Sequence, residues 1–127
     1  MQYQSTKELG RRGEELVCEW YIKSDFALIG KNVRVHGYRQ IGEIDLIFTK
    51  DKELVFVEVK TRRSSRFGDG RDSVGFRKQM KLRKSVAWYL SNNSQYDLFN
   101  WRIDVAEVNI DNSGNKIIIL ENAMEDY

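Results

Sequence analysis

The sequence predicts a mixed α/β fold in which helices pack on a central β-sheet, with the elements in the order α-β-β-β-α-β-β. Three observations predict this fold. Segments 42–48 and 53–60 have strand patterns and are joined by the short polar segment 49–52. Segments before and after this pair carry apolar residues at helical spacing. The length of 127 residues suits a single domain, 1–127, with one core.

The first helix is expected over residues 5–23. Ser5 followed by Glu8 has the form of a capping box. Gly10 and Gly13 lie inside this helix, where a glycine costs about 1 kcal/mol relative to alanine. That cost indicates a backbone that must come close to a neighbouring strand or to a bound substrate. One apolar face is predicted from Leu9, Leu16, Val17, Trp20 and Tyr21.

Three strands are expected next. The first covers residues 26–35 with a break at 30–32, and a loop over 36–41 follows it. The second and third are the strands 42–48 and 53–60, which we expect to form a hairpin.

The second half of the chain predicts a basic loop, a helix and a further hairpin. The loop covers residues 64–70, and the helix runs from a cap at Asp72 or Ser73 to about residue 92. Strands over 101–108 and 116–120 flank the turn 111–115, and the acidic tail 121–127 is expected to be loose. The core face of the helix is predicted from Phe76, Met80, Val86, Ala87 and Leu90.

Composition excludes several classes of protein. A single cysteine, Cys18, rules out an internal disulfide framework, and with the single histidine, His36, it argues against a zinc site. No apolar run approaches the length of about 20 residues that spans a membrane, and no signal-peptide pattern is present. We therefore expect a cytoplasmic protein that is not bound to a membrane.

Charged residues in the central strands point to chemistry. Glu58 and Lys60 project from the same face of their strand, and in a hairpin Asp45 could lie opposite them. Two carboxylates suit a hard divalent cation, and a neighbouring lysine can orient water or stabilise negative charge. The alternative is an ordinary ion pair at a strand end.

Basic residues are concentrated directly after this pattern. Residues 59–84 contain ten Lys or Arg and two Asp, a local charge of +8, although the whole chain carries only +2. Such a band favours a polyanionic partner near the carboxylates, whereas its alternative is a solvated helix face.

The motifs taken together resemble the YraN-like family, which belongs to the PD-(D/E)XK superfamily with the restriction-endonuclease-like fold and is similar to archaeal Holliday-junction resolvases. The resemblance covers residues 10–108. It is carried by Gly10-x-x-Gly13-Glu14, by GEIDLI from Gly42, by LVFVEVKTR from Leu54, by Lys78 and by Arg102-Ile-Asp104-Val.

The resemblance implies a metal-dependent nuclease. Asp45, Glu58 and Glu14 would hold Mg²⁺ or Mn²⁺, and Lys60 would position the attacking water on a phosphodiester. The proline of the family's PD motif is replaced here by Ile44. A homodimer fits the same resemblance, because symmetric cutting needs two sites. The residues expected to contact nucleic acid, from the resemblance and the basic band, are Arg11, Gly13, Arg62, Arg63, Arg66, Arg77, Lys78, Gln79, Lys81 and Lys84.

Three hypotheses follow from the sequence. The first is a nuclease that acts on branched or otherwise structured DNA. The second is a DNA-binding accessory module that does not cut and serves recombination, repair or DNA uptake. The third is a protein-interaction domain whose strand-end charges are ordinary ion pairs. The first hypothesis predicts metal-dependent cleavage. The second predicts salt-dependent DNA binding without cleavage, and the third predicts no DNA affinity.

Overall fold

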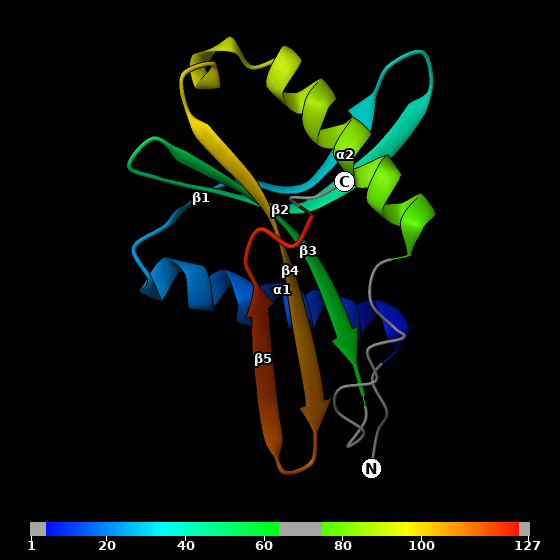
Figure 1. The fold of residues 1–127 in the computed structure, drawn as a ribbon. Coiled ribbons are helices and arrows are strands. Elements are labelled where there is room, and N and C mark those ends of the chain that lie inside the picture. Colours follow the sequence, from blue (N-terminus) through cyan, green and yellow to red (C-terminus); the bar gives the residue numbers. More distant parts are fainter. Residues whose placement is uncertain (1–4, 64–74, 125–127) are drawn as a thin grey trace.

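The structure is a computed structural model and describes residues 5–63 and 75–124 (Figure 1). Its elements confirm the predicted order, with a short 3₁₀ helix added before the fourth strand. The elements are α1 (Thr6–Lys23), β1 (Ala27–His36), β2 (Gln40–Lys50), β3 (Glu53–Arg62), α2 (Phe76–Ser91), η2 (Ser94–Tyr96), β4 (Asn100–Asp111) and β5 (Gly114–Leu120).

The strands form one mixed sheet in the spatial order β1-β2-β3-β4-β5. β1, β2 and β3 pair antiparallel, β3 and β4 pair parallel, and β4 and β5 pair antiparallel. The parallel pair requires a crossover connection, and α2 lies within it. Asp51 and Lys52 both have positive φ in the tight turn between β2 and β3, the conformation that suits the twist of a two-residue hairpin.

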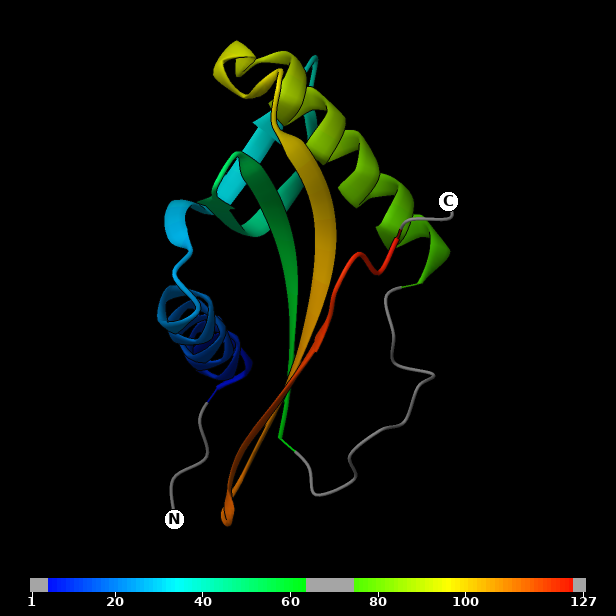
Figure 2. The same cartoon turned by 60° about the vertical axis from the view of Figure 1, so that its left-hand side comes forward.

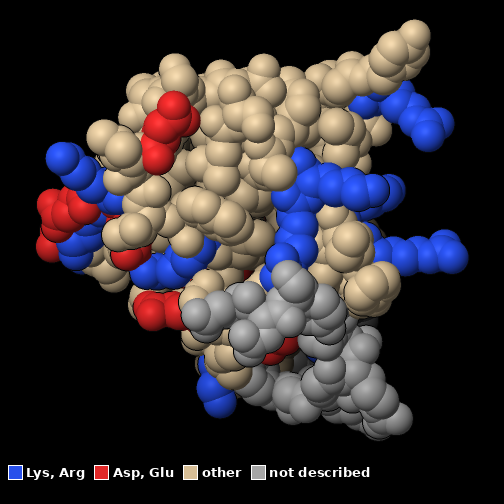
Figure 3. Space-filling view, turned by 45° about the horizontal axis from the view of Figure 1, so that its top comes forward, with Lys and Arg blue, Asp and Glu red and all other residues tan. Residues whose placement is uncertain are grey.

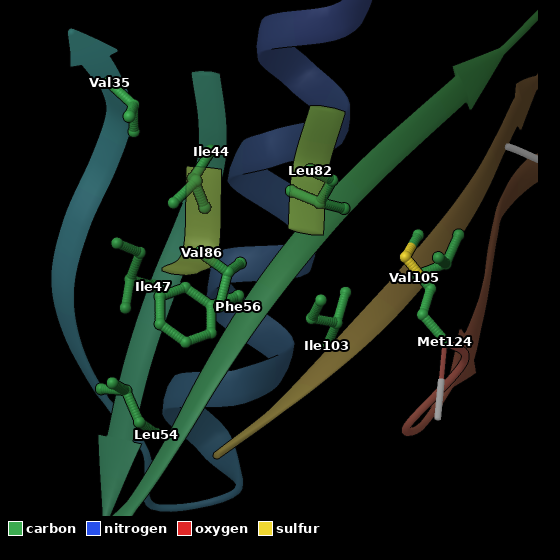
Figure 4. Close-up of a cluster of buried hydrophobic side chains, with 10 residues drawn as sticks. All are labelled: Val35, Ile44, Ile47, Leu54, Phe56, Leu82, Val86, Ile103, Val105 and Met124. Carbon is green, nitrogen blue, oxygen red and sulfur yellow. The ribbon is translucent and has the colours of Figure 1, made fainter. Parts of the chain in front are cut away.

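The two helices cover opposite faces of the sheet, as Figure 2 shows. One apolar cluster lies on the α2 side and includes Phe56, Leu82 and Val86 (Figure 4). The other lies on the α1 side and includes Val17 and Phe48. The sheet is therefore buried on both faces, which explains why β3 is a nearly continuous apolar run.

α1 begins as predicted, because the Ser5 side chain accepts a hydrogen bond from the Glu8 N–H at 3.1 Å. Gly13 shows why this helix contains a glycine that packs closely. A Cβ on Gly13 would lie 1.8 Å from Thr61 Oγ1, so only glycine lets α1 approach β3 this closely. Gly13 is buried. The resemblance implied that it faces the substrate, and the structure corrects this to close packing.

A buried polar cluster ties α1 to β4. Tyr21 donates its hydroxyl to Asp104 Oδ2 at 2.6 Å, and Arg102 Nε donates to Asp104 Oδ1 at 3.0 Å. The Asn122 N–H also donates to Asp104 Oδ1, at 2.9 Å. Asp104 is fully buried, and these donors satisfy its carboxylate.

The predicted core face of α2 is wrong in part. Phe76, Met80 and Ala87 are exposed, whereas Leu82, Ser85 and Val86 are buried. The reason is a tertiary contact that periodicity does not reveal. A Cβ on Gly42 would lie 2.5 Å from Ser85 Oγ, so β2 at this glycine admits the helix face that carries Ser85. The helix begins at Phe76, and the predicted capping residues 72 and 73 lie outside the described residues.

The C-terminal tail is also held more firmly than predicted as far as it is described. Met124 is buried in the α2-side cluster, and the Ala123 N–H donates to the Ile103 carbonyl at 2.8 Å. Residues 121–124 are therefore not loose, and residues 125–127 lie outside the described residues.

Strand boundaries differ from the predictions by a few residues. β1 continues to His36 and β2 begins at Gln40, so the predicted loop over 36–41 shrinks to three residues. The turn between β4 and β5 is likewise shorter than the predicted 111–115, because β4 ends at Asp111 and β5 begins at Gly114. The predicted loop 64–70 lies outside the described residues.

Candidate active site

The site begins where β2 and β3 separate. Their ladder runs from Lys50 opposite Glu53 to Leu46 opposite Val57. Asp45 and Glu58 are the next residues along each strand. In place of a backbone carbonyl, Asp45 Oδ2 accepts the hydrogen bond from the Val59 N–H, at 2.8 Å. The predicted opposition of Asp45 and Glu58 is confirmed, at the point where the sheet opens.

Side-chain alternation also changes at Asp45. Ile44 belongs to the cluster on the α2 side, whereas Leu46, two residues later, belongs to the cluster on the α1 side. The partner strand has a matching irregularity, because Asn32 has φ 49° between the pairs of Lys31 and Val33 with β2. Asp45 therefore lies where the side chains of β2 change faces, between the two layers of the fold, although the register with β1 is the same at Lys31 and at Val33.

Asp45 and Glu58 form a coupled pair of carboxyl groups. Both are largely removed from solvent and hydrogen-bonded to each other. Burial, followed by the charge of Asp45, raises the pKa of Glu58 to about 7. Burial also raises the pKa of Asp45, against the opposing effect of the Val59 N–H. The two carboxyl groups therefore titrate as a coupled pair, and burial raises the pKa of both.

Two lysines offset part of this negative charge. Lys78 Nζ lies 3.7 Å from Glu58 Oε1, with the Lys78 side chain 63% exposed and that of Glu58 12% exposed. Lys60 is half-buried, and its charge, like that of Lys78, lowers the pKa of Glu58. Burial and the neighbouring carboxylate nevertheless outweigh both cations.

Glu14 lies beside this pair on α1. It is half-buried, and burial, followed by the charge of Asp45, raises its pKa. A hydrogen bond with the Asn32 side chain acts in the opposite direction. Within residues 5–63 and 75–124, no three or more His, Cys, Asp or Glu side chains come together as a metal-binding group. The structure therefore brings Asp45 and Glu58 together and leaves Glu14 near them but outside their contact.

The carboxylate pair fits a hard divalent cation, which prefers oxygen ligands and would remove the repulsion between two buried acids. The pair also borders a hollow of about 320 Å³ against α2, which Lys78 and Lys81 line from the opposite side. This hollow, called the α2 hollow below, gives the carboxylates an opening to solvent. Its shape follows from Gly42, which lets α2 approach β2 at Ser85.

The predicted nucleic-acid residues spread over several elements. On α2, Arg77, Lys78, Lys81 and Lys84 are exposed and Gln79 is half-buried. Figure 3 shows several Lys and Arg side chains together at the right of this face, whereas basic and acidic side chains are mixed at its left. Arg11 is exposed on α1. Arg62, the last residue of β3, is half-buried, and Arg63 after it is exposed. Arg66 lies outside the described residues.

Sequence reasoning missed two contributors to the site. The backbone N–H of Val59 fixes the orientation of Asp45, and a backbone group carries no signal in the residue pattern. Asn32 shapes the irregularity opposite Asp45 and contacts Glu14. Its signal was present, because asparagine is enriched at positive φ and lies within the predicted break at 30–32.

Comparison with known proteins places the chain in a family. The uncharacterised protein family UPF0102 matches residues 13–108, which include both strands of the site. The chain belongs to the UPF0102 family. A UPF0102 protein of Caldicellulosiruptor bescii is 38% identical over 119 residues, covering 92% of this chain and 97% of that protein. A UPF0102 protein of Legionella pneumophila is 35% identical over 120 residues, covering 94% and 97%.

A solved structure also resembles this UPF0102 protein in part. It is SfsA of Pyrococcus furiosus in complex with Ca²⁺, with a TM-score of 0.39 and 16% sequence identity. The match covers 92% of this chain and 64% of the SfsA chain. Among the described residues, no helix is long and apolar enough to cross a membrane.

Proposed function

We propose that this UPF0102 protein is a metal-dependent endonuclease that hydrolyses phosphodiester bonds of branched or otherwise structured DNA. One observation carries the proposal. Asp45 and Glu58 face each other in the opening between β2 and β3, beside a hollow whose far wall carries Lys78 and Lys81. Acids that would bind a cation thus lie opposite cations that would attract a polyanion.

Mg²⁺ or Mn²⁺ would be held by Asp45 and Glu58, with Glu14 as the candidate third acid. A bound ion of this kind supplies a Lewis acid for a phosphoryl oxygen and lowers the pKa of its water. Val59 keeps Asp45 oriented through its N–H, and Lys60 would orient the attacking water or stabilise developing negative charge. A homodimer belongs to the same proposal, because paired cuts in a branched DNA need two sites.

Cleavage of labelled DNA tests this proposal. The substrates are a four-way junction, a flap, a linear duplex and a single strand, each with Mg²⁺ or Mn²⁺ and with EDTA. We expect metal-dependent nicking that Asp45→Asn and Lys60→Ala abolish, while Glu19→Gln at an exposed position of α1 leaves it unchanged. Full activity in Asp45→Asn would overturn the assignment of the site.

A DNA-binding module that does not cut is the second candidate. It is favoured by the separation of Glu14 from the carboxylate pair, since the described residues contain no group of three acids. This candidate predicts salt-dependent binding with no dependence on divalent metal. Neutralising Lys81 and Lys84 should then reduce the salt slope, by about 1 for each phosphate that the protein no longer neutralises.

A further inference from the structure

A second and larger hollow lies on the opposite face of the sheet. It occupies about 590 Å³ between the first half of α1 and strands β1 and β2. We call it the α1 hollow. Glu43 lines both this hollow and the α2 hollow, so the two meet at one residue of β2. Because α1 and α2 cover opposite faces (Figure 2), a ligand that follows both hollows passes around the carboxylate site.

One stripe of α1 leads from this hollow to the site. Lys7, Gly10, Arg11 and Glu14 all line the hollow, at the three- and four-residue spacing that forms one helix face. Lys7 lies about two turns before Glu14, the candidate third acid of the site.

Gly10 lacks the packing reason that explains Gly13. A Cβ on Gly13 would collide with Thr61, whereas a Cβ on Gly10 would meet no atom of the described residues within 4 Å. Glycine inside a helix costs about 1 kcal/mol relative to alanine. Within residues 5–63 and 75–124, no packing contact of Gly10 explains that cost. A ligand that comes close to the helix backbone in the α1 hollow would explain it.

The cations of the hollow are available to an anionic ligand. Lys7, Arg11 and Arg34 line it and are exposed, and within residues 5–63 and 75–124 their side chains form no ion pair or hydrogen bond. The acids Glu14 and Glu43 interact electrostatically with Asp45. Two of the three acids that line the hollow therefore lie toward the carboxylate site, where a divalent cation would offset their charge, and the third, Glu8, lies in the first turn of α1.

We propose that the α1 hollow binds the sugar-phosphate backbone of a second arm of branched DNA, while the first arm lies along α2. Lys7, Arg11 and Arg34 would contact phosphates, and Gly10 would let the backbone approach the helix. Linear duplex is stiff, with a persistence length of about 150 bp, and does not bend around the edge of a small protein. A branch point places two arms on the two faces without bending. The inference rests on the proposed function for its ligand and gives that function its substrate preference.

Fluorescence anisotropy in EDTA, where the proposed metal-dependent cleavage cannot occur, tests the inference. The variant K7Q/R11Q/R34Q is compared with the matched control R12Q/K23Q/K52Q, which removes three charges from exposed positions outside both hollows. We expect the first variant to bind a four-way junction at least about tenfold more weakly, with a salt slope lower by about 1 for each phosphate that it no longer neutralises. Its affinity for a linear duplex should match that of the control. Equal decreases in affinity for junction and duplex, or no decrease beyond that of the control, would contradict the proposal that the α1 hollow binds a second DNA arm.

Gly10→Ala provides a readout that a purely structural role would not give. Because the added methyl group enters open space and alanine favours helix, the unfolding temperature should rise. Junction affinity should fall all the same, and unchanged affinity would count against the inference. The two proposals can fail separately. If nicking is absent in Mg²⁺ while the binding difference in EDTA persists, the nuclease proposal fails and the DNA-binding inference stands. Absence of all DNA binding would overturn both proposals.

Discussion

The sheet carries two sets of buried carboxylates, and they differ in what the fold provides for them. Asp104 receives hydrogen bonds from Tyr21, from Arg102 and from the Asn122 N–H. Asp45 and Glu58 instead face each other, with one backbone N–H and a lysine at 3.7 Å.

This difference separates a structural acid, Asp104, from a poised site, by which we mean Asp45 and Glu58 with their raised pKa values. The fold itself completes the surroundings of Asp104, so its charge stabilises the packing of α1 and the tail on β4. Burial and mutual repulsion raise the pKa values of Asp45 and Glu58, which means that the Val59 N–H and the neighbouring lysines do not offset the cost of ionising both groups. A divalent cation would offset that cost. Both sets lie in motifs that resemble one family, so motif membership alone does not distinguish their roles.

Replacing the structural acid should have the largest effect. Asp104→Ala leaves Tyr21, Arg102 and the Asn122 N–H without their acceptor in a buried position. We expect the free energy of unfolding to fall by about 3 kcal/mol, as when one partner of a buried pair is removed. Urea denaturation measures the decrease. Asp45→Asn is the matched change at the poised site and should cost far less, since it removes repulsion. A larger decrease for Asp45→Asn than for Asp104→Ala would reverse the comparison.

Glu58→Gln should stabilise the protein in a pH-dependent way. The folded pKa of Glu58 is about 7, above the ordinary value of 4.5, so the folded state binds its proton more tightly than the unfolded state. The stability from this proton is present below pH 4.5 and is lost as the pH rises to about 7. The glutamine variant keeps a neutral group throughout. In metal-free buffer it should therefore exceed the parent by about 3 kcal/mol at pH 8 and by little at pH 4. A stability difference that does not change with pH would contradict the raised pKa of Glu58.

Local rules predicted the parts of this molecule that depend on neighbours in sequence. The period of two in a strand and the tight hairpin predicted that Asp45 would oppose Glu58. The capping pattern predicted the start of α1 at Ser5. The cost of glycine in a helix predicted a close approach at Gly13, although it did not decide between a strand and a substrate.

Contacts between distant segments could not be predicted in the same way. The buried face of α2 depends on Gly42 of β2, which no helical period contains. Met124 is an isolated apolar residue in an acidic tail, so its burial has no periodic signal. The separation of Glu14 from the carboxylate pair depends on how α1 lies on the sheet, and strand patterns do not specify it.

Divalent cations should stabilise the folded protein by binding at Asp45 and Glu58, and not at other acids. A ligand that binds only the folded state at ten times its Kd raises the free energy of unfolding by about 1.4 kcal/mol. We expect Mg²⁺ or Mn²⁺ to raise the unfolding temperature at pH 8, and Asp45→Asn to abolish the increase. Glu19→Gln, which changes an exposed acid on α1, is the control and should keep it. An equal increase in Asp45→Asn would place the bound ion elsewhere.

Lys78→Gln should give the smallest effect and the finest test of the electrostatics. Lys78 lies 3.7 Å from Glu58 but is 63% exposed, so solvent screens the pair and its removal should change stability by less than about 0.5 kcal/mol. Because the Lys78 charge lowers the pKa of Glu58, the variant should titrate Glu58 above about 7. Carboxyl NMR titration measures this shift directly. Lys84→Gln, on the same helix and with the same change of charge, is the control. An equal shift in Lys84→Gln would mean that the general charge of α2, rather than the contact with Lys78, sets the ionisation of Glu58.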